Sequence, residues 1–138
     1  MRPLTGLVTT VGTRSCVIPI EHVVETMRPL PIEGIANAPS FVLGIAIVRG
    51  EPVVVMDASA LLGAARSAPP SRFVTMRVED RTIALAVDAV SGVATLDARF
   101  ESLPALLRAA DVIDAIAPLD ERLLVVLRAA RVVEAAPS

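Results

Sequence analysis

Apolar residues along this chain come in short runs that are separated by tight, polar turns. Residues 53–56 read VVVM and residues 124–127 read LVVL, and each run follows a polar turn, RGE at 49–51 and DER at 120–122. Runs of this length, rich in β-branched residues and bounded by turn signals, predict short strands. Several such strands in each half of the chain are typical of a small barrel.

The two halves of the chain resemble each other. Residues 44–62 align without a gap on residues 115–133, and residues 7–23 align on residues 74–90 at nearly the same separation. Each half then predicts strand, turn, strand, connection, strand, turn, strand, which we interpret as a duplication. A chance alignment of Val-rich strands is the alternative.

A duplication predicts two barrels within one domain that spans residues 1–138. A barrel of roughly 65 residues is only marginally stable alone, so the two should pack together through an aliphatic interface. Residues 64–71 (AARSAPPS) suggest a boundary between approximate subdomains 14–70 and 71–130. The N-terminal strand and the C-terminal helix could cross between the subdomains. Short helices are expected at 21–27, 58–63, 104–110 and 129–135.

The composition excludes much enzyme chemistry. Hydrophobic residues make up 54% of the chain and aromatic residues 2%, so the core must be aliphatic. There is no Lys, which removes Schiff-base chemistry and the P-loop lysine. A single His (His22) and a single Cys (Cys16) leave no histidine metal cluster and no Cys-x-x-Cys site. We therefore expect no catalytic residue, no cofactor and no metal.

Charge and hydropathy also limit the possible partners. The net charge is −2 and stacking aromatic residues are scarce, so nucleic-acid binding is not expected. The longest uncharged stretch, 34–48, is too short for a spanning helix and contains Asn37 and Pro39, so no membrane insertion is expected. One unpaired thiol suits a reducing compartment, which predicts a cytoplasmic protein.

The remaining candidate side chains are few. His22 is favoured as a surface or partly packed residue because no nucleophile motif accompanies it. Asp111 and Asp114 are favoured as turn or cap residues. Arg49 is more distinctive, because it lies at the tip of an apolar hairpin, where Gly50 permits a tight turn. Its planar guanidinium suits carbonyls or a partner's carboxylate, although a solvated turn arginine is an equal alternative.

Three segments of the chain form a recognisable series of motifs. Residues 18–25 read IPIEHVVE, residues 35–50 read IANAPSFVLGIAIVRG and are followed by VMDA at 55–58, and residues 86–90 read AVDAV. In this order they resemble the motifs of the CheW family, the coupling proteins of bacterial chemosensory arrays, and the likeness extends from about residue 6 to residue 133. The chain departs from the pattern at Ile47, where the family usually has Asn, and at Val54, where it usually has Pro.

This resemblance implies a mainly β fold of two SH3-like five-stranded barrels packed together, with a few short helices. It also implies a non-enzymatic adaptor that couples the cytoplasmic tips of chemoreceptors to a CheA-type histidine kinase, in the cytoplasm and recruited to receptor arrays. The alternative is a small ligand-binding or regulatory β-barrel of a non-chemotaxis signalling system.

The resemblance also carries candidate partner-binding residues. Val23, Glu25, Arg49 and Gly50 match the family segments tied to these contacts. A helical receptor tip lying in a groove between the barrels would add Ile32, Val42 and Val90 as lining residues, for which burial in the core is the alternative.

Overall fold

The chain folds almost entirely into short strands. The computed structural model describes residues 2–63, 69–100 and 111–137. In these ranges the strands are β1 (Arg2–Val11), β2 (Arg14–Pro19), β3 (Val23–Met27), β4 (Val42–Val48), β5 (Glu51–Asp57), β6 (Arg72–Val78), β7 (Arg81–Val87), β8 (Ala89–Ala98), β9 (Ile113–Leu119) and β10 (Arg122–Leu127). The helical segments are the 3₁₀ turn η1 (Ile20–His22) and the helices α1 (Ala58–Leu61) and α3 (Ala129–Ala135).

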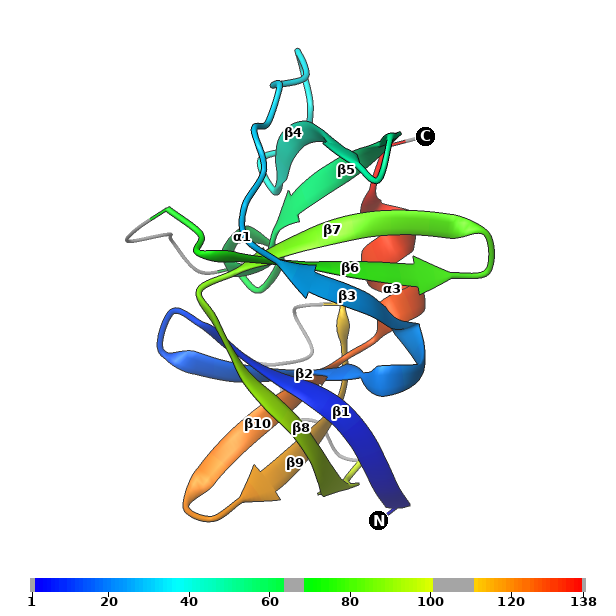
Figure 1. The fold of residues 1–138 in the computed structure, drawn as a ribbon. Helices are drawn as coiled ribbons and strands as arrows, with labels where there is room; N and C mark the ends of the chain where they lie inside the picture. The colour runs from blue at the N-terminus through cyan, green and yellow to red at the C-terminus, as the bar shows by residue number, and fades with distance from the viewer. Residues whose placement is uncertain (1, 64–68, 101–110, 138) are drawn as a thin grey trace.

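These strands form two curled five-stranded sheets, one above the other in Figure 1. The order in one sheet, here called barrel A, is β8-β1-β2-β10-β9. The order in the other, barrel B, is β3-β6-β7-β5-β4. Each sheet contains one parallel pair, β2 with β10 and β5 with β7, and its other pairs are antiparallel. The predicted mainly β fold with two SH3-like five-stranded units is confirmed.

Both barrels close in the same way, through an isolated bridge beyond the end of an edge strand. In barrel B, Glu33 and Ile45 exchange two backbone hydrogen bonds of 2.8 Å. In barrel A, Arg99 and Ile116 exchange bonds of 2.8 and 3.0 Å. The sequence repeat aligns Ile45 with Ile116. The duplication is therefore visible in the backbone pairing as well as in the sequence.

The apolar residues divide into three clusters. One fills barrel A and includes Val17 and Leu124, and another fills barrel B and includes Phe73 and Val55. The largest, here called the central cluster, draws side chains from strands of both barrels and from α3. Strands β2, β5, β7 and β10 alternate between a barrel interior and the central cluster, so both of their faces are buried. This explains their unbroken apolar runs.

The strands do not follow the expected subdomains 14–70 and 71–130. The chain forms β1 and β2 in barrel A, builds all five strands of barrel B, and returns to barrel A at β8. The repeat describes equivalent strands correctly, but each sheet needs strands from both halves, because the parallel pairs join β2 to β10 and β5 to β7. A cut in the chain at residue 70 would therefore divide both sheets.

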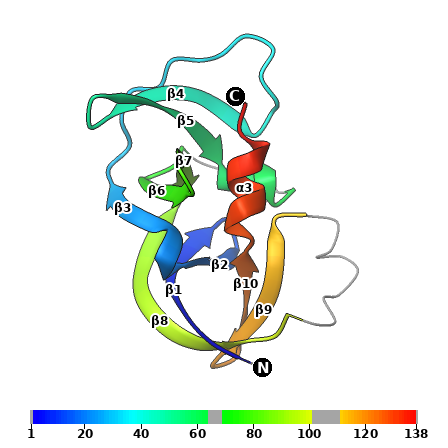
Figure 2. The same cartoon turned by 90° about the vertical axis from the view of Figure 1, so that its right-hand side faces the viewer.

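The C-terminal helix follows a strand of barrel A but packs on barrel B. Figure 2 shows α3 running from the end of β10 along the other barrel, where it contacts β6 and β7. Arg81 at the start of β7 donates hydrogen bonds to the carbonyl oxygens of Val133 (3.2 Å) and Pro137. The Val133 carbonyl also accepts the backbone N–H of Ala136, so the guanidinium adds a second donor at the C-terminal end of the helix.

One expected helix was wrong and two are present. Residues 21–27 form part of η1 and then β3, because the extended residues Val23, Glu25, Thr26 and Met27 pair with β6 and continue sheet B. Helix α1 begins after Asp57, whose carboxylate accepts a hydrogen bond from the Ser59 backbone N–H at 3.1 Å. Helix α3 matches the expected 129–135, and the expected helix at 104–110 lies outside the described residues.

No helix in the described ranges has the length and apolar character needed to cross a bilayer.

Candidate functional site

The β4–β5 hairpin places a charged side chain at the rim of barrel B. Its turn residues Arg49 and Gly50 have φ angles of 53° and 81°, and a type I′ turn requires positive φ at both central positions. Glycine adopts this conformation freely, whereas arginine does so at some cost. The turn thereby holds the backbone of Arg49 at the hairpin tip with its side chain 78% exposed.

Arg49 is paired with Glu25 of β3. Its Nη2 lies 2.7 Å from Glu25 Oε1 and its Nε lies 3.1 Å from Oε2, so the contact is bidentate. Strands β3 and β4 are the two edges of sheet B, and the pair therefore links opposite edges of the barrel. The hydrogen bonds from Arg49, together with its positive charge, lower the pKa of the Glu25 carboxyl, and the same contact raises the pKa of Arg49.

A β-bulge in β3 sets the direction of Glu25. Val23 pairs with Met76 and Glu25 pairs with Thr75, which leaves Val24 as the extra residue. The buried Thr75 hydroxyl accepts a hydrogen bond from the Glu25 N–H (3.2 Å) and donates one to the Glu25 carbonyl oxygen (3.3 Å). The bulge leaves Val24 54% exposed.

Apolar side chains surround the ion pair. Ile47 of β4, 61% exposed, lies between two shallow depressions. One is lined by Pro31, Ile32, Glu33, Ile45 and Ile47, and the other by Glu25, Met27, Leu30, Ile47, Val48 and Arg49. We call the residues of both depressions the Ile47 surface. Single exposed apolar residues are ordinary, but a cluster beside a bidentate ion pair is typical of a contact surface.

The predicted binding residues fall into two groups. Arg49, Gly50, Glu25 and Ile32 belong to the β4–β5 turn and the Ile47 surface. The second group, Val42, Val23 and Val90, packs inward. Val42 is only 9% exposed. Val23 and Val90 are partly buried against the central cluster, at equivalent places near the starts of β3 and β8.

Sequence reasoning missed several exposed apolar residues. Ile47, Val24 and Val93 are each more than half exposed. In β8, every second residue from Ala89 to Asp97 is exposed, and Val93 is the one large apolar side chain in that series. A bulky apolar residue on the polar face of an alternating strand is the signal that could have identified it.

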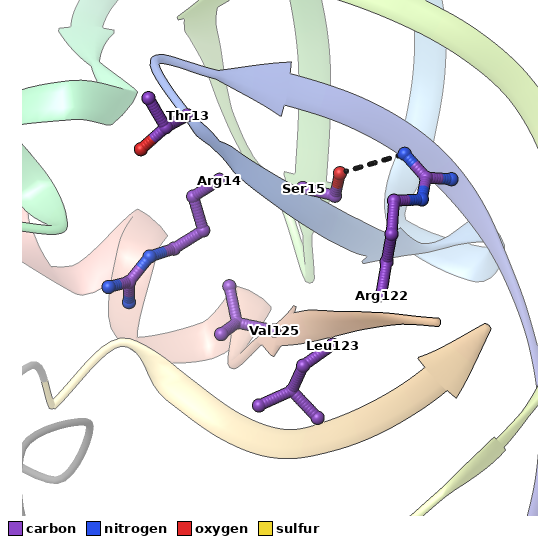
Figure 3. A pocket seen from close by; sticks show the side chains of 6 residues that line it. All are labelled: Thr13, Arg14, Ser15, Arg122, Leu123 and Val125. Atoms are coloured by element: carbon purple, nitrogen blue, oxygen red, sulfur yellow. Dashed lines mark hydrogen bonds between the residues drawn. The ribbon is translucent and has the colours of Figure 1, made fainter. Parts of the chain in front are cut away.

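Barrel A carries a different depression, shown in Figure 3. It is lined by Thr13, Arg14, Ser15, Arg122, Leu123 and Val125, where the parallel strands β2 and β10 begin to pair. Arg122 Nη1 donates to Ser15 Oγ at 3.3 Å, while the guanidinium of Arg14 extends in the opposite direction. Because the two cations diverge, they do not form a joint site for an anion.

The other candidate side chains have structural surroundings. Burial raises the pKa of the Cys16 thiol to about 12, so it stays protonated and unreactive. His22 Nδ1 contacts the Arg77 carbonyl oxygen at 3.3 Å. Asp111 and Asp114 form ion pairs with Arg128 beside α3. Within the described ranges, no three His, Cys, Asp or Glu side chains are grouped to hold a metal ion.

Two closed barrels with a shared core, and an exposed apolar surface beside an ion pair on one of them, define a double β-barrel domain. A profile of the CheW-like domain family matches residues 5–136, and the chain belongs to this family. The resemblance found in the sequence is thereby confirmed.

Two relatives describe the family further. The chain is 34% identical over 91 residues to the chemotaxis protein CheW of Rhizobium meliloti (strain 1021), a match that covers 64% of this chain and 59% of the relative. The crystal structure of the scaffolding protein TtCheW from Thermoanaerobacter tengcongensis superposes with a TM-score of 0.80 at 22% identity, over 92% of this chain and 90% of the other. Neither name denotes an enzyme, in agreement with the expected non-enzymatic, CheW-like scaffold.

Proposed function

We propose that this chain is an adaptor that couples the cytoplasmic tips of chemoreceptors to a CheA-type histidine kinase, in the cytoplasm and recruited to receptor arrays. Membership of the CheW-like family supports this proposal. The observation that carries it is the bidentate Arg49–Glu25 pair within the exposed Ile47 surface, because Arg49 and Glu25 are residues that the family resemblance ties to partner contacts.

The Ile47 surface has the composition of a reversible protein contact. Ile47 offers apolar area that a partner can bury, which stabilises the bound state. Arg49 and Glu25 satisfy each other's charges and present a fixed arrangement of donors and acceptors at the rim. Rim charges mainly set association rate and specificity, whereas the apolar centre mainly sets residence time.

A second contact is needed for coupling, and the junction between the barrels is the place we propose for it. Val23 and Val90 each lie partly buried against the central cluster, one on each barrel. A helical receptor tip that places an apolar stripe against both residues would contact both barrels at once. Simultaneous binding at two separate surfaces would hold receptor and kinase together without any conformational change in this chain.

The alternative, a small-ligand barrel, has less support. Such a protein needs an enclosed pocket with a few converging polar groups. Among the described residues, the apolar cavity bounded by Leu61, Leu85, Val112 and Val132 has a volume of about 10 Å³, at the lower limit for one water molecule. The other depressions described above are shallow and lie on the outside of the barrels.

The proposal can be tested by titrating the full chain with a CheA-type kinase and with a receptor cytoplasmic fragment from the same cell. We expect the parent chain to bind both at micromolar concentration. Arg49→Ala and Ile47→Ser should weaken binding of one partner at least about tenfold, a loss typical of a residue at the centre of an interface.

Matched variants separate this effect from a general loss of charge or apolar area. Arg77→Ala removes an exposed arginine from barrel B outside the Ile47 surface, and Leu123→Ser removes an exposed apolar residue from barrel A. If Arg77→Ala weakens binding as much as Arg49→Ala, the contact is not at the Ile47 surface. If the parent chain binds neither partner, the adaptor function is wrong.

A further inference from the structure

We propose that Thr75 is a positioning residue for the Glu25–Arg49 pair. Its hydroxyl holds the bulged backbone of β3 so that the Glu25 carboxylate faces the β4–β5 hairpin. Thr75 is 1% exposed and cannot itself be a contact residue. The role in aligning the pair is a property of the free chain, and only its consequence for partner binding rests on the adaptor function proposed above.

The geometry of the bulge supports this assignment. In this bulge Val24 is the extra residue, while Glu25 stays opposite Thr75 of β6. The Thr75 hydroxyl serves both groups of one residue, since it accepts from the Glu25 N–H (3.2 Å) and donates to the Glu25 carbonyl oxygen (3.3 Å). Two hydrogen bonds to one residue restrict its φ and ψ angles and therefore the direction of its Cα–Cβ bond.

Barrel A provides an internal comparison. The repeat aligns Val24, Glu25 and Thr75 with Ser91, Gly92 and Val8. There Val8 pairs with Gly92 and Thr9 pairs with Val90, so Ser91 is the extra residue of a bulge at the equivalent place. This bulge forms with a valine where barrel B has Thr75. The hydroxyl is therefore not required to make the bulge.

What distinguishes barrel B is the side chain that the bulge carries. Gly92 has no side chain to direct, and the residue equivalent to Arg49 is Asp120. In barrel B the bulged strand carries a carboxylate that must meet two guanidinium nitrogens at 2.7 and 3.1 Å. A bidentate contact demands a defined direction, and the buried hydroxyl occurs in the barrel where that direction matters.

The test uses the full chain without a partner and measures the pKa of the Glu25 carboxyl by NMR. In Thr75→Val, which removes the hydroxyl at nearly constant volume, we expect this pKa to rise from its lowered value towards that of an ordinary glutamate. Thr75→Ser, which keeps the hydroxyl, should restore the parent value. Thr75→Ala should behave like Thr75→Val and serves if the valine variant does not fold.

Thr9→Val is the matched control. Thr9 is a fully buried threonine of barrel A, and its hydroxyl donates to the Cys16 carbonyl oxygen at 3.2 Å. This variant should lose stability but leave the pKa of Glu25 unchanged. A Glu25 pKa that is unaffected by loss of the Thr75 hydroxyl, or that moves equally in Thr9→Val, would overturn the proposal.

Partner titration extends the test to function. Thr75→Val should weaken binding of the partner that recognises the Ile47 surface, and it should add no further loss in a Glu25→Gln background, because the residue acts through Glu25. Equal losses in both backgrounds would contradict positioning. If the parent chain binds neither partner, the adaptor function fails, and the NMR measurement still decides the role of Thr75.

Discussion

Barrels A and B have the same strand topology but carry different side chains at equivalent places. Both have a central parallel pair, a closing backbone bridge and a β-bulge at equivalent positions. Even the hairpin turns correspond, since Arg49 and Asp120 have φ angles of 53° and 54°. These shared features depend on the backbone, so they are maintained by many different side chains.

The barrels differ along their edges. In barrel A the ten-residue strand β8 pairs with β1 along nearly its whole length. In barrel B the equivalent strand β3 has five residues, and residues 28–41 complete the edge with a single bridge at Glu33. Ile47 is 61% exposed beside the Arg49–Glu25 pair, and Pro118, at the equivalent place of barrel A, is exposed as well. The two copies therefore differ in the length of an edge strand and in the side chains that they carry at equivalent places.

The largest expected effect concerns the cores. Phe73 fills barrel B and is fully buried, and Phe73→Ala should destabilise the protein by about 3–5 kcal/mol. Because the central cluster joins the barrels, we expect both to unfold in one transition. Hydrogen exchange at the amides of each barrel, measured as urea is increased, shows whether the two barrels unfold together. Two separate transitions, with barrel A still folded, would show that the barrels are independent.

The closing bridge of barrel B depends on a glycine. Gly44 has a φ of 146°, and a Cβ atom there would lie 2.1 Å from the Glu33 carbonyl oxygen, whereas barrel A has Ala115 at the equivalent place. Gly44→Ala should cost about 2–4 kcal/mol, from backbone strain and a clash with backbone. Gly34→Ala, with no atom within 4 Å, is the control and should cost far less in the same urea titration. Equal losses of stability in the two variants would mean that the backbone of Gly44 approaches Glu33 less closely than described.

Among the described residues of the central cluster, Cys16 carries a titratable group, and the repeat places Ile83 at the equivalent position in the other barrel. Burial raises the pKa of its thiol from 9.0 to about 12. The thiol thus has a higher pKa in the folded chain than in the unfolded chain. The contribution of the buried, protonated thiol to the free energy of unfolding is therefore fully present below pH 9 and is lost as pH rises towards 12. Relative to Cys16→Ala, the parent should lose about 1.4 kcal/mol of stability per pH unit above pH 9. Parallel stability curves for the two chains would contradict this.

The smallest effect is expected at the exposed ion pair. The pKa of Glu25 is lowered by Arg49, so its contribution to stability is present above the ordinary glutamate pKa of about 4.3 and is lost as pH falls through the lowered value. Parent and Glu25→Gln should therefore differ slightly in melting temperature at pH 7 and converge in acid. Asp120→Asn in barrel A, at the position equivalent to Arg49, is the control. A Glu25→Gln difference that persists at pH 2 would have a cause other than the charge.

The candidate site was partly predictable. Arg49, Gly50 and Glu25 could be predicted because they belong to local sequence motifs. Such motifs can be recognised without knowledge of the tertiary structure. Ile47 and Thr75 could not be assigned to the site from the sequence, because neither residue type in its local sequence indicates whether the side chain is exposed or buried. Their roles arise from neighbours that are distant in the chain, namely the 28–41 segment for Ile47 and the β3 bulge for Thr75.

Spacing and alternation along the chain were enough to predict strands, turns, a repeat and two units, because strand length, turn chemistry and burial on two faces leave a local pattern of residue types. The assignment of strands to barrels was not predictable in this way. It depends on which edges pair, and the two parallel pairs join residues 29 apart (β5 with β7) and 109 apart (β2 with β10). Those long-range pairings interleave the barrels and move α3 onto the opposite one. They also bring Glu25 and Arg49 together, from two edges of one sheet.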